Sequence, residues 1–121
     1  MRFARADLVE AKRLPPPEGV YEIPCFHAQQ AVEKSFKALL AHYGISVPYT
    51  HNLKILLDLL SSSISVPPVV SSSVLLTDYA VTTRYPGEEE PLTEEDHREA
   101  VRLADAVVAW ANQCLGLDRT V

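Results

Sequence analysis

The sequence predicts an all-α protein, an up-and-down bundle of four to five helices. Apolar residues recur every three or four positions between residues 25 and 43 and again between residues 53 and 60, the spacing of one helical face. Thr93 precedes three acidic residues, a pattern typical of a helix start. Because single domains commonly run to about 100–150 residues, we expect residues 1–121 to form a single domain.

The first predicted helix runs from Arg2 to Leu14, where the apolar pattern is weak but compatible with one buried side. Three consecutive prolines, residues 15 to 17, end it, because proline removes a backbone donor and disfavours helix in the residue before it. Gly19 then supplies a flexible joint before the next helix.

The second and longest predicted helix begins near Pro24 and ends near Tyr43, with Gly44 as its stop. One face forms a core stripe. Its predicted members, with the last two at its edges, are Ala28, Val32, Phe36, Leu39, Tyr43, Ser35 and Leu40.

The opposite side of this helix is polar, and we predict that it contacts another molecule. Its members are His27, Gln30, Lys34 and Ala41, with Lys37 near one edge and Ala31 and Ala38 along the other border. Two interpretations stay open. The polar side chains bind a nucleotide, or they hydrogen-bond across a homodimer interface, where the small alanines allow close approach.

Three further segments follow. A helix from Leu53 to Leu60 is capped by Thr50 or Asn52. Residues 69 to 84 are ambiguous, since their Val, Thr and Ser content favours a strand whereas their apolar spacing favours a helix. The last helix starts after Thr93 and stops at Leu115–Gly116.

Composition and charge limit the classes of function that we expect for this chain. The formal net charge of −5 argues against general nucleic-acid affinity, which usually requires a basic surface, although a local basic patch stays open. The apolar runs fall short of the roughly 20 residues of a membrane span, and the N-terminal residues do not resemble a signal peptide. We therefore expect a cytoplasmic protein without membrane contact. We expect Cys25 and Cys114 to be free thiols that form no disulfide. The four histidines lack the spacing of metal ligands, so we expect no metal site and no cofactor.

Several strings together resemble the HEPN domain family, in particular its small stand-alone prokaryotic type, often encoded beside a minimal nucleotidyltransferase. They are F-H-A-Q-Q-A-V-E-K-S-F-K-A-L-L from position 26, Gly44, His51-Asn52-Leu53, Tyr79 and T-T-R-Y-P at positions 82 to 86. The resemblance spans residues 6 to 114. It implies a bundle of four or five helices, usually a homodimer, with a link to nucleotides or RNA. It also implies helix for residues 69 to 84.

The same resemblance speaks against ribonuclease activity. Ribonuclease members of the HEPN group carry an Arg, four to six further residues, and then a His. Arg84 is followed by Y-P-G-E-E-E-P, and His97 lies too far along the chain. The catalytic signature is therefore absent, and we expect no catalytic residues.

We therefore expect a non-catalytic homodimeric module that binds a nucleotide or partners a minimal nucleotidyltransferase in a toxin–antitoxin-like system. Lys34 or Arg84 would hold phosphate, and Tyr79 or Tyr85 would stack on the base. The full candidate site is His27, Gln30, Lys34, His51, Tyr79, Arg84 and Tyr85.

Two alternatives remain at this point. One is a degenerate, metal-independent ribonuclease that uses Arg84 with a non-adjacent histidine: His27, His51 or His97. The other is a purely structural interaction protein. A basic concavity with Lys34, Lys37 and Arg84 would favour ligand binding, whereas a flat apolar surface would favour assembly.

Overall fold

The computed structural model describes residues 1–17, 19–80 and 91–116, and these residues form helices and loops without a strand. The prediction of an all-α fold is confirmed. In chain order the elements are α1 (Arg2–Lys12), α2 (Glu22–His42), α3 (Leu53–Ser61), α4 (Pro68–Ser72), the 3-10 helix η1 (Ser73–Ala80) and α5 (Glu94–Cys114).

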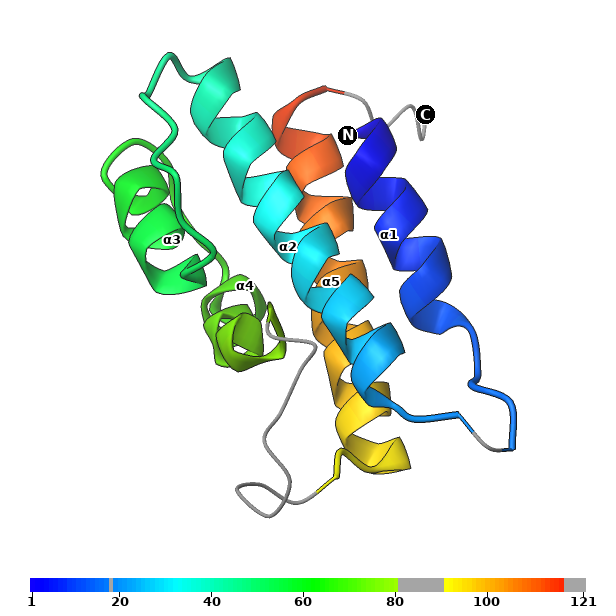
Figure 1. The fold of residues 1–121 in the computed structure, drawn as a ribbon. Coiled ribbons are helices and arrows are strands. Elements are labelled where there is room, and N and C mark those ends of the chain that lie inside the picture. Colours follow the sequence, from blue (N-terminus) through cyan, green and yellow to red (C-terminus); the bar gives the residue numbers. More distant parts are fainter. Residues whose placement is uncertain (18, 81–90, 117–121) are drawn as a thin grey trace.

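The α2 helix is the centre of the bundle. In Figure 1, α1 and α2 run side by side in front of α5, and α3 and α4 lie along the other flank of α2. The α1–α2 pair is an antiparallel hairpin whose two helices are joined by the proline-rich connection (Figure 1).

The apolar core is formed mainly by α2, α3 and α5. Val32, Phe36 and Leu39 of α2 are fully buried, as predicted. On α3 the buried leucines are those of the predicted repeat, and α5 buries Ala100, Leu103, Ala104, Val107, Val108 and Ala111 on its inner side. Trp110 is half-buried and meets the Phe36 ring edge-on at 6.5 Å between centroids, so it packs helix against helix within one chain.

Local signals explain where the helices begin and end. The Asn52 side chain accepts from the backbone N–H groups of Lys54 and Ile55, which makes it the cap of α3. Thr93 and Asp96 form a reciprocal capping box at the start of α5. Gly44 has a φ of +72° just after α2, a conformation that glycine adopts without steric cost.

Two boundaries differ from the prediction. The first helix stops at Lys12 instead of Leu14, because Arg13 is already extended (φ −71°, ψ 134°) on the approach to the prolines. The segment from residue 69 is helical as the family resemblance implied, but it begins at Pro68 and continues as a 3-10 helix. The rest of the predicted helix, residues 81 to 84, lies outside the described residues.

Tyr43 was wrongly placed in the core stripe of α2. It is the C-cap residue, 37% exposed, beyond the last buried turn. Its ring lies past the end of the apolar core, so its polar hydroxyl stays near the surface, where it pairs with the Cys114 thiol. Partial burial is the main cause that raises the pKa of the Cys114 thiol, and the Tyr43 hydrogen bond only partly offsets it.

None of the described helices combines the length and apolar character needed to cross a bilayer.

Candidate ligand-binding face on α1 and α2

Asp7 of α1 links two of the predicted polar residues of α2. Its Oδ1 lies 2.9 Å from His27 Nδ1, and its Oδ2 accepts from Lys34 Nζ at 2.5 Å. The Asp7 side chain is only 12% exposed. Asp7 lies on the same buried side of α1 as Ala4, so helix packing holds the carboxylate against α2. We call Asp7, His27 and Lys34 the Asp7 cluster.

Glu33 of α2 organises a second cluster beside the first. Its side chain is 5% exposed; Oε1 lies 2.8 Å from His51 Nδ1 and accepts from Gln29 Nε2 at 3.1 Å, and Oε2 accepts from Lys37 Nζ at 3.2 Å. Gln29 and Lys37 are one helical turn from Glu33 on either side, whereas His51 comes from the loop before α3. We call these four residues the Glu33 cluster.

The state of Glu33 follows from this environment. Burial alone would raise the pKa of the Glu33 carboxyl, but hydrogen bonds from His51, Gln29 and Lys37 outweigh it, and the net effect lowers the pKa below its ordinary 4.5. Glu33 is therefore ionised at neutral pH, a buried anion held by several donors.

Gln30 extends the Glu33 cluster. Its Nε2 donates to Gln29 Oε1 at 2.7 Å, while Gln29 Nε2 also lies 3.3 Å from the His51 carbonyl oxygen. The two glutamines thus tie the loop carrying His51 to the surface of α2.

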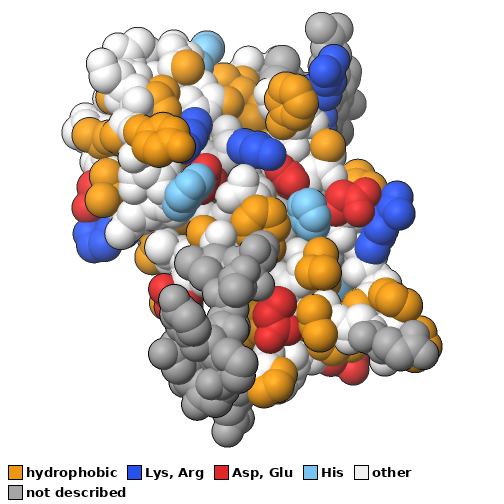
Figure 2. Space-filling view, viewed as in Figure 1, with side chains coloured by type: hydrophobic (Ala, Val, Ile, Leu, Met, Phe, Trp, Pro, Cys, Tyr) orange, Lys and Arg blue, Asp and Glu red, His pale blue; other side chains and the backbone are white. Residues whose placement is uncertain are grey.

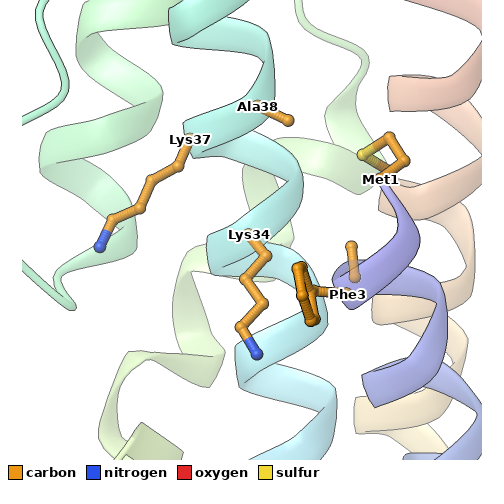
Figure 3. A pocket seen from close by; sticks show the side chains of 6 residues that line it. Met1, Phe3, Lys34, Lys37 and Ala38 are labelled. Atoms are coloured by element: carbon orange, nitrogen blue, oxygen red, sulfur yellow. The ribbon is translucent and has the colours of Figure 1, made fainter.

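A shallow depression lies between the N-terminal end of α1 and the middle of α2. It has a volume of about 280 Å³ and is lined by Met1, Phe3, Ala4, Lys34, Lys37 and Ala38. Figure 3 shows the Phe3 ring beside the Lys34 side chain, with the two lysine ammonium groups pointing in different directions. The depression therefore has an apolar floor and a cationic margin.

Charged side chains gather on this face. Figure 2 shows acidic, basic and histidine side chains in a band across α1 and α2. Within the two clusters both carboxylates are nearly buried, whereas the lysine side chains are 39% (Lys34) and 26% (Lys37) exposed. Arg2 adds another cation, with its guanidinium carbon 5.2 Å from the centre of the Phe3 ring. The accessible charge at the depression is therefore positive despite the acidic composition.

The predicted polar residues are brought together only in part. His27 and Lys34 meet at Asp7, and Gln30 joins the cluster that contains His51. Tyr79 is half-buried and packs against the apolar core. Arg84 and Tyr85 lie outside the described residues.

The predicted polar side of α2 is contacted by α1 of the same chain. Ala31, predicted at an open border, is fully buried, and Ala38 lies under the N-terminal end of α1. The small residues do permit close approach, but the approaching surface is intramolecular.

The sequence prediction missed Asp7, Glu33 and Phe3 as members of this face. The sequence does contain an indication for Asp7. Helical spacing puts it on the same side of the first helix as Ala4 and Ala11, and a carboxylate is unusual on a buried side. Gln29, Glu33 and Lys37 are likewise spaced by four residues. No such signal marks Phe3, which is 65% exposed.

The third histidine considered as a catalytic partner of Arg84, His97, has a structural role. It is 4% exposed, and its Nε2 lies 2.5 Å from the Ala11 carbonyl oxygen, so Nε2 carries a proton and donates. The Tyr21 ring packs beside it at 5.5 Å. His97 thus joins the C-terminal end of α1 to α5. Within the described part of the chain, no three His, Cys, Asp or Glu residues are grouped to hold a metal ion.

The fold and this face define a small helical-bundle domain with a polar surface on its central hairpin. The model of the HEPN domain family matches residues 1–114 of the 121-residue chain. The chain therefore belongs to the HEPN domain family. Searches of the curated proteins and of the solved structures give no significant match.

Proposed function

We propose that this HEPN domain is a non-catalytic module that binds a nucleotide in the depression between α1 and α2. The observation that carries the proposal is a concavity lined by two lysines and by an exposed aromatic ring. A nucleotide offers the complementary groups, namely anionic phosphates and a flat base with an apolar face.

Lys34 and Lys37 are the phosphate-binding groups in this proposal. Both lie on one side of α2, three residues apart, and both side chains are partly accessible. Their long, flexible stems allow the ammonium groups to turn toward a ligand. Arg2 is close enough to Phe3 to add a third cation at the margin.

Phe3 is the base-binding group. Bases stack on aromatic side chains with a free energy of about 1–3 kcal/mol per base, and the Phe3 ring is 65% exposed beside the depression. Phe3 thus takes the part predicted from sequence for Tyr79 or Tyr85. Met1, Ala4 and Ala38 complete an apolar floor.

The residues support binding over catalysis. The sequence lacks the Arg-to-His spacing of HEPN ribonucleases, and His97 is buried and engaged with a backbone carbonyl. The other two candidate histidines, His27 and His51, each face a buried carboxylate through Nδ1.

Assembly is a second candidate function, either as a homodimer or with a minimal nucleotidyltransferase in a toxin–antitoxin-like pair. The observation that favours it is an apolar depression of about 390 Å³ beside His27, in which Leu14, Val20 and Ile23 are all at least half exposed. Such clusters are common at protein–protein contacts. This surface is distinct from the Phe3 depression, so binding and assembly are compatible.

Calorimetric titration with ATP tests the binding proposal. Lys34→Glu reverses a charge at the depression, and we expect the dissociation constant to rise about tenfold or more, which corresponds to ~1.4 kcal/mol. Lys54→Glu is the matched control, because Lys54 is an exposed lysine on α3, away from the depression, whose ammonium group pairs with Asp58.

Equal weakening by both substitutions would mean that ATP responds only to overall charge, and the assigned site would be wrong. Absence of heat with folded wild-type protein would contradict nucleotide binding and leave assembly as the function to test.

A further inference from the structure

We propose that Asp7 and Glu33 are internal counter-anions that a bound phosphate displaces from Lys34 and Lys37, and that His27 and His51 take up protons as this happens. This inference rests on the proposed nucleotide site and adds its regulation: ligand binding is coupled to proton uptake.

The two clusters share one design. In each cluster, one oxygen atom of a nearly buried carboxylate contacts a histidine and the other oxygen atom accepts a hydrogen bond from a lysine. Asp7 uses Oδ1 for His27 and Oδ2 for Lys34. Glu33 uses Oε1 for its histidine and Oε2 for its lysine. Each lysine can therefore leave while the histidine stays in place.

Removing the lysine changes the charge balance at the carboxylate. A buried carboxylate without a cationic partner is costly. A neutral histidine donates one hydrogen bond from Nδ1 but supplies no positive charge, whereas a protonated histidine supplies both. Transfer of a lysine to phosphate thus favours the protonated form of the histidine that remains.

The surroundings of both histidines are compatible with this exchange. His27 faces Asp7 of α1 and Lys34 of α2, and the neighbouring depression also contains Glu10 and Arg13, which pair with each other. Solvent protons reach His27 directly, because its side chain is 29% exposed.

His51 faces Glu33 and Lys37 of α2, and the Tyr49 ring of its own loop lies 6.5 Å away. Its side chain is 64% exposed, so Nε2 can be protonated from solvent. In both clusters the histidine is therefore accessible to solvent, whereas the carboxylate is nearly buried.

The direction of the coupling follows from linkage. If a ligand favours the protonated histidines, protons equally favour the ligand. Affinity should therefore increase as the pH falls.

Titration with ATP in buffers of different ionisation enthalpy measures the protons taken up per ligand bound. The variants are His27→Asn and His51→Asn, singly and together, since the asparagine amide can keep a hydrogen bond to the carboxylate without gaining charge. His42→Asn is the matched control, because His42 is an exposed residue in the last turn of α2 whose ring meets that of Tyr43 and neither carboxylate cluster.

We expect each single substitution to remove part of the proton uptake seen with the wild type. The double variant should lose most of the proton uptake. Between pH 8 and pH 6 we expect the wild-type affinity to change about tenfold. The affinity of the double variant should change less over the same range. The phosphate of ATP also titrates near pH 6, so the difference in proton uptake between wild type and variants, and not the absolute number, reports on the histidines.

Two results would overturn the inference, and they are distinguishable. ATP binding with equal proton uptake in wild type and double variant would contradict proton coupling while leaving the nucleotide site intact. No binding by folded wild-type protein at any pH would contradict the nucleotide site and the coupling together.

Discussion

The two sides of α2 use burial in different ways. One side places Val32, Phe36 and Leu39 in the apolar core, where their contribution comes from removing apolar surface from water. The other side buries the carboxylate of Glu33 beneath histidine, lysine and glutamine donors. The first contribution is independent of charge, whereas the second depends on ionisation. A ligand that binds as proposed would therefore act on the polar side without disturbing the core.

The largest expected effect lies on the apolar side. Phe36→Ala should lower the free energy of unfolding by about 3–5 kcal/mol, because it removes a fully buried ring and leaves a cavity against Trp110. Urea denaturation followed by circular dichroism measures this. Phe3→Ala, at an exposed phenylalanine, is the control. A midpoint unchanged by Phe36→Ala would mean that the core has been assigned to the wrong side of α2.

A smaller and pH-dependent effect is expected on the polar side. Glu33→Gln keeps the shape but removes the charge, and at pH 7 it should cost about 1 kcal/mol, since several of the donors remain partly accessible to water. The pKa of Glu33 is lowered in the folded protein. Its contribution is therefore present above the unfolded value of about 4.5 and is lost as the pH falls through the lowered folded value.

Thermal unfolding from pH 7 down to pH 3 tests the sign of that effect. The gap between wild type and Glu33→Gln should narrow toward the acid end. Asp58→Asn, which breaks an exposed pair on α3, should follow the wild type throughout. A gap that widens in acid would show that the carboxylate is not stabilised by its donors.

The contrast between the two sides also explains how much could be predicted from sequence. Periodicity identifies Val32 and Phe36 as core residues because apolar spacing is a property of one helix. The partner of His27 and Lys34 could not be predicted in this way, since Asp7 reaches them only when α1 packs antiparallel to α2. The polar side of α2 lies off the core stripe, but the partner of His27 and Lys34 in the structure is another helix of the same chain.

Helix ends were predictable where a side chain acts locally, as with the capping box of Thr93 and Asp96. The 3-10 geometry of η1 was not, because the Val, Thr and Ser content of this segment favours a strand and apolar spacing does not distinguish one type of helix from another. The depression depends on Phe3, whose exposed ring lines it only through the packing of α1 on α2.

The central claim is that a nucleotide occupies the depression between α1 and α2, and mapping of amide chemical-shift changes on addition of ATP tests it most directly. We predict saturable changes concentrated at Phe3, Ala4, Lys34, Lys37 and Ala38, the residues that line it. Changes concentrated instead around Leu14, Val20 and Ile23, or none at all in folded protein, would contradict the claim.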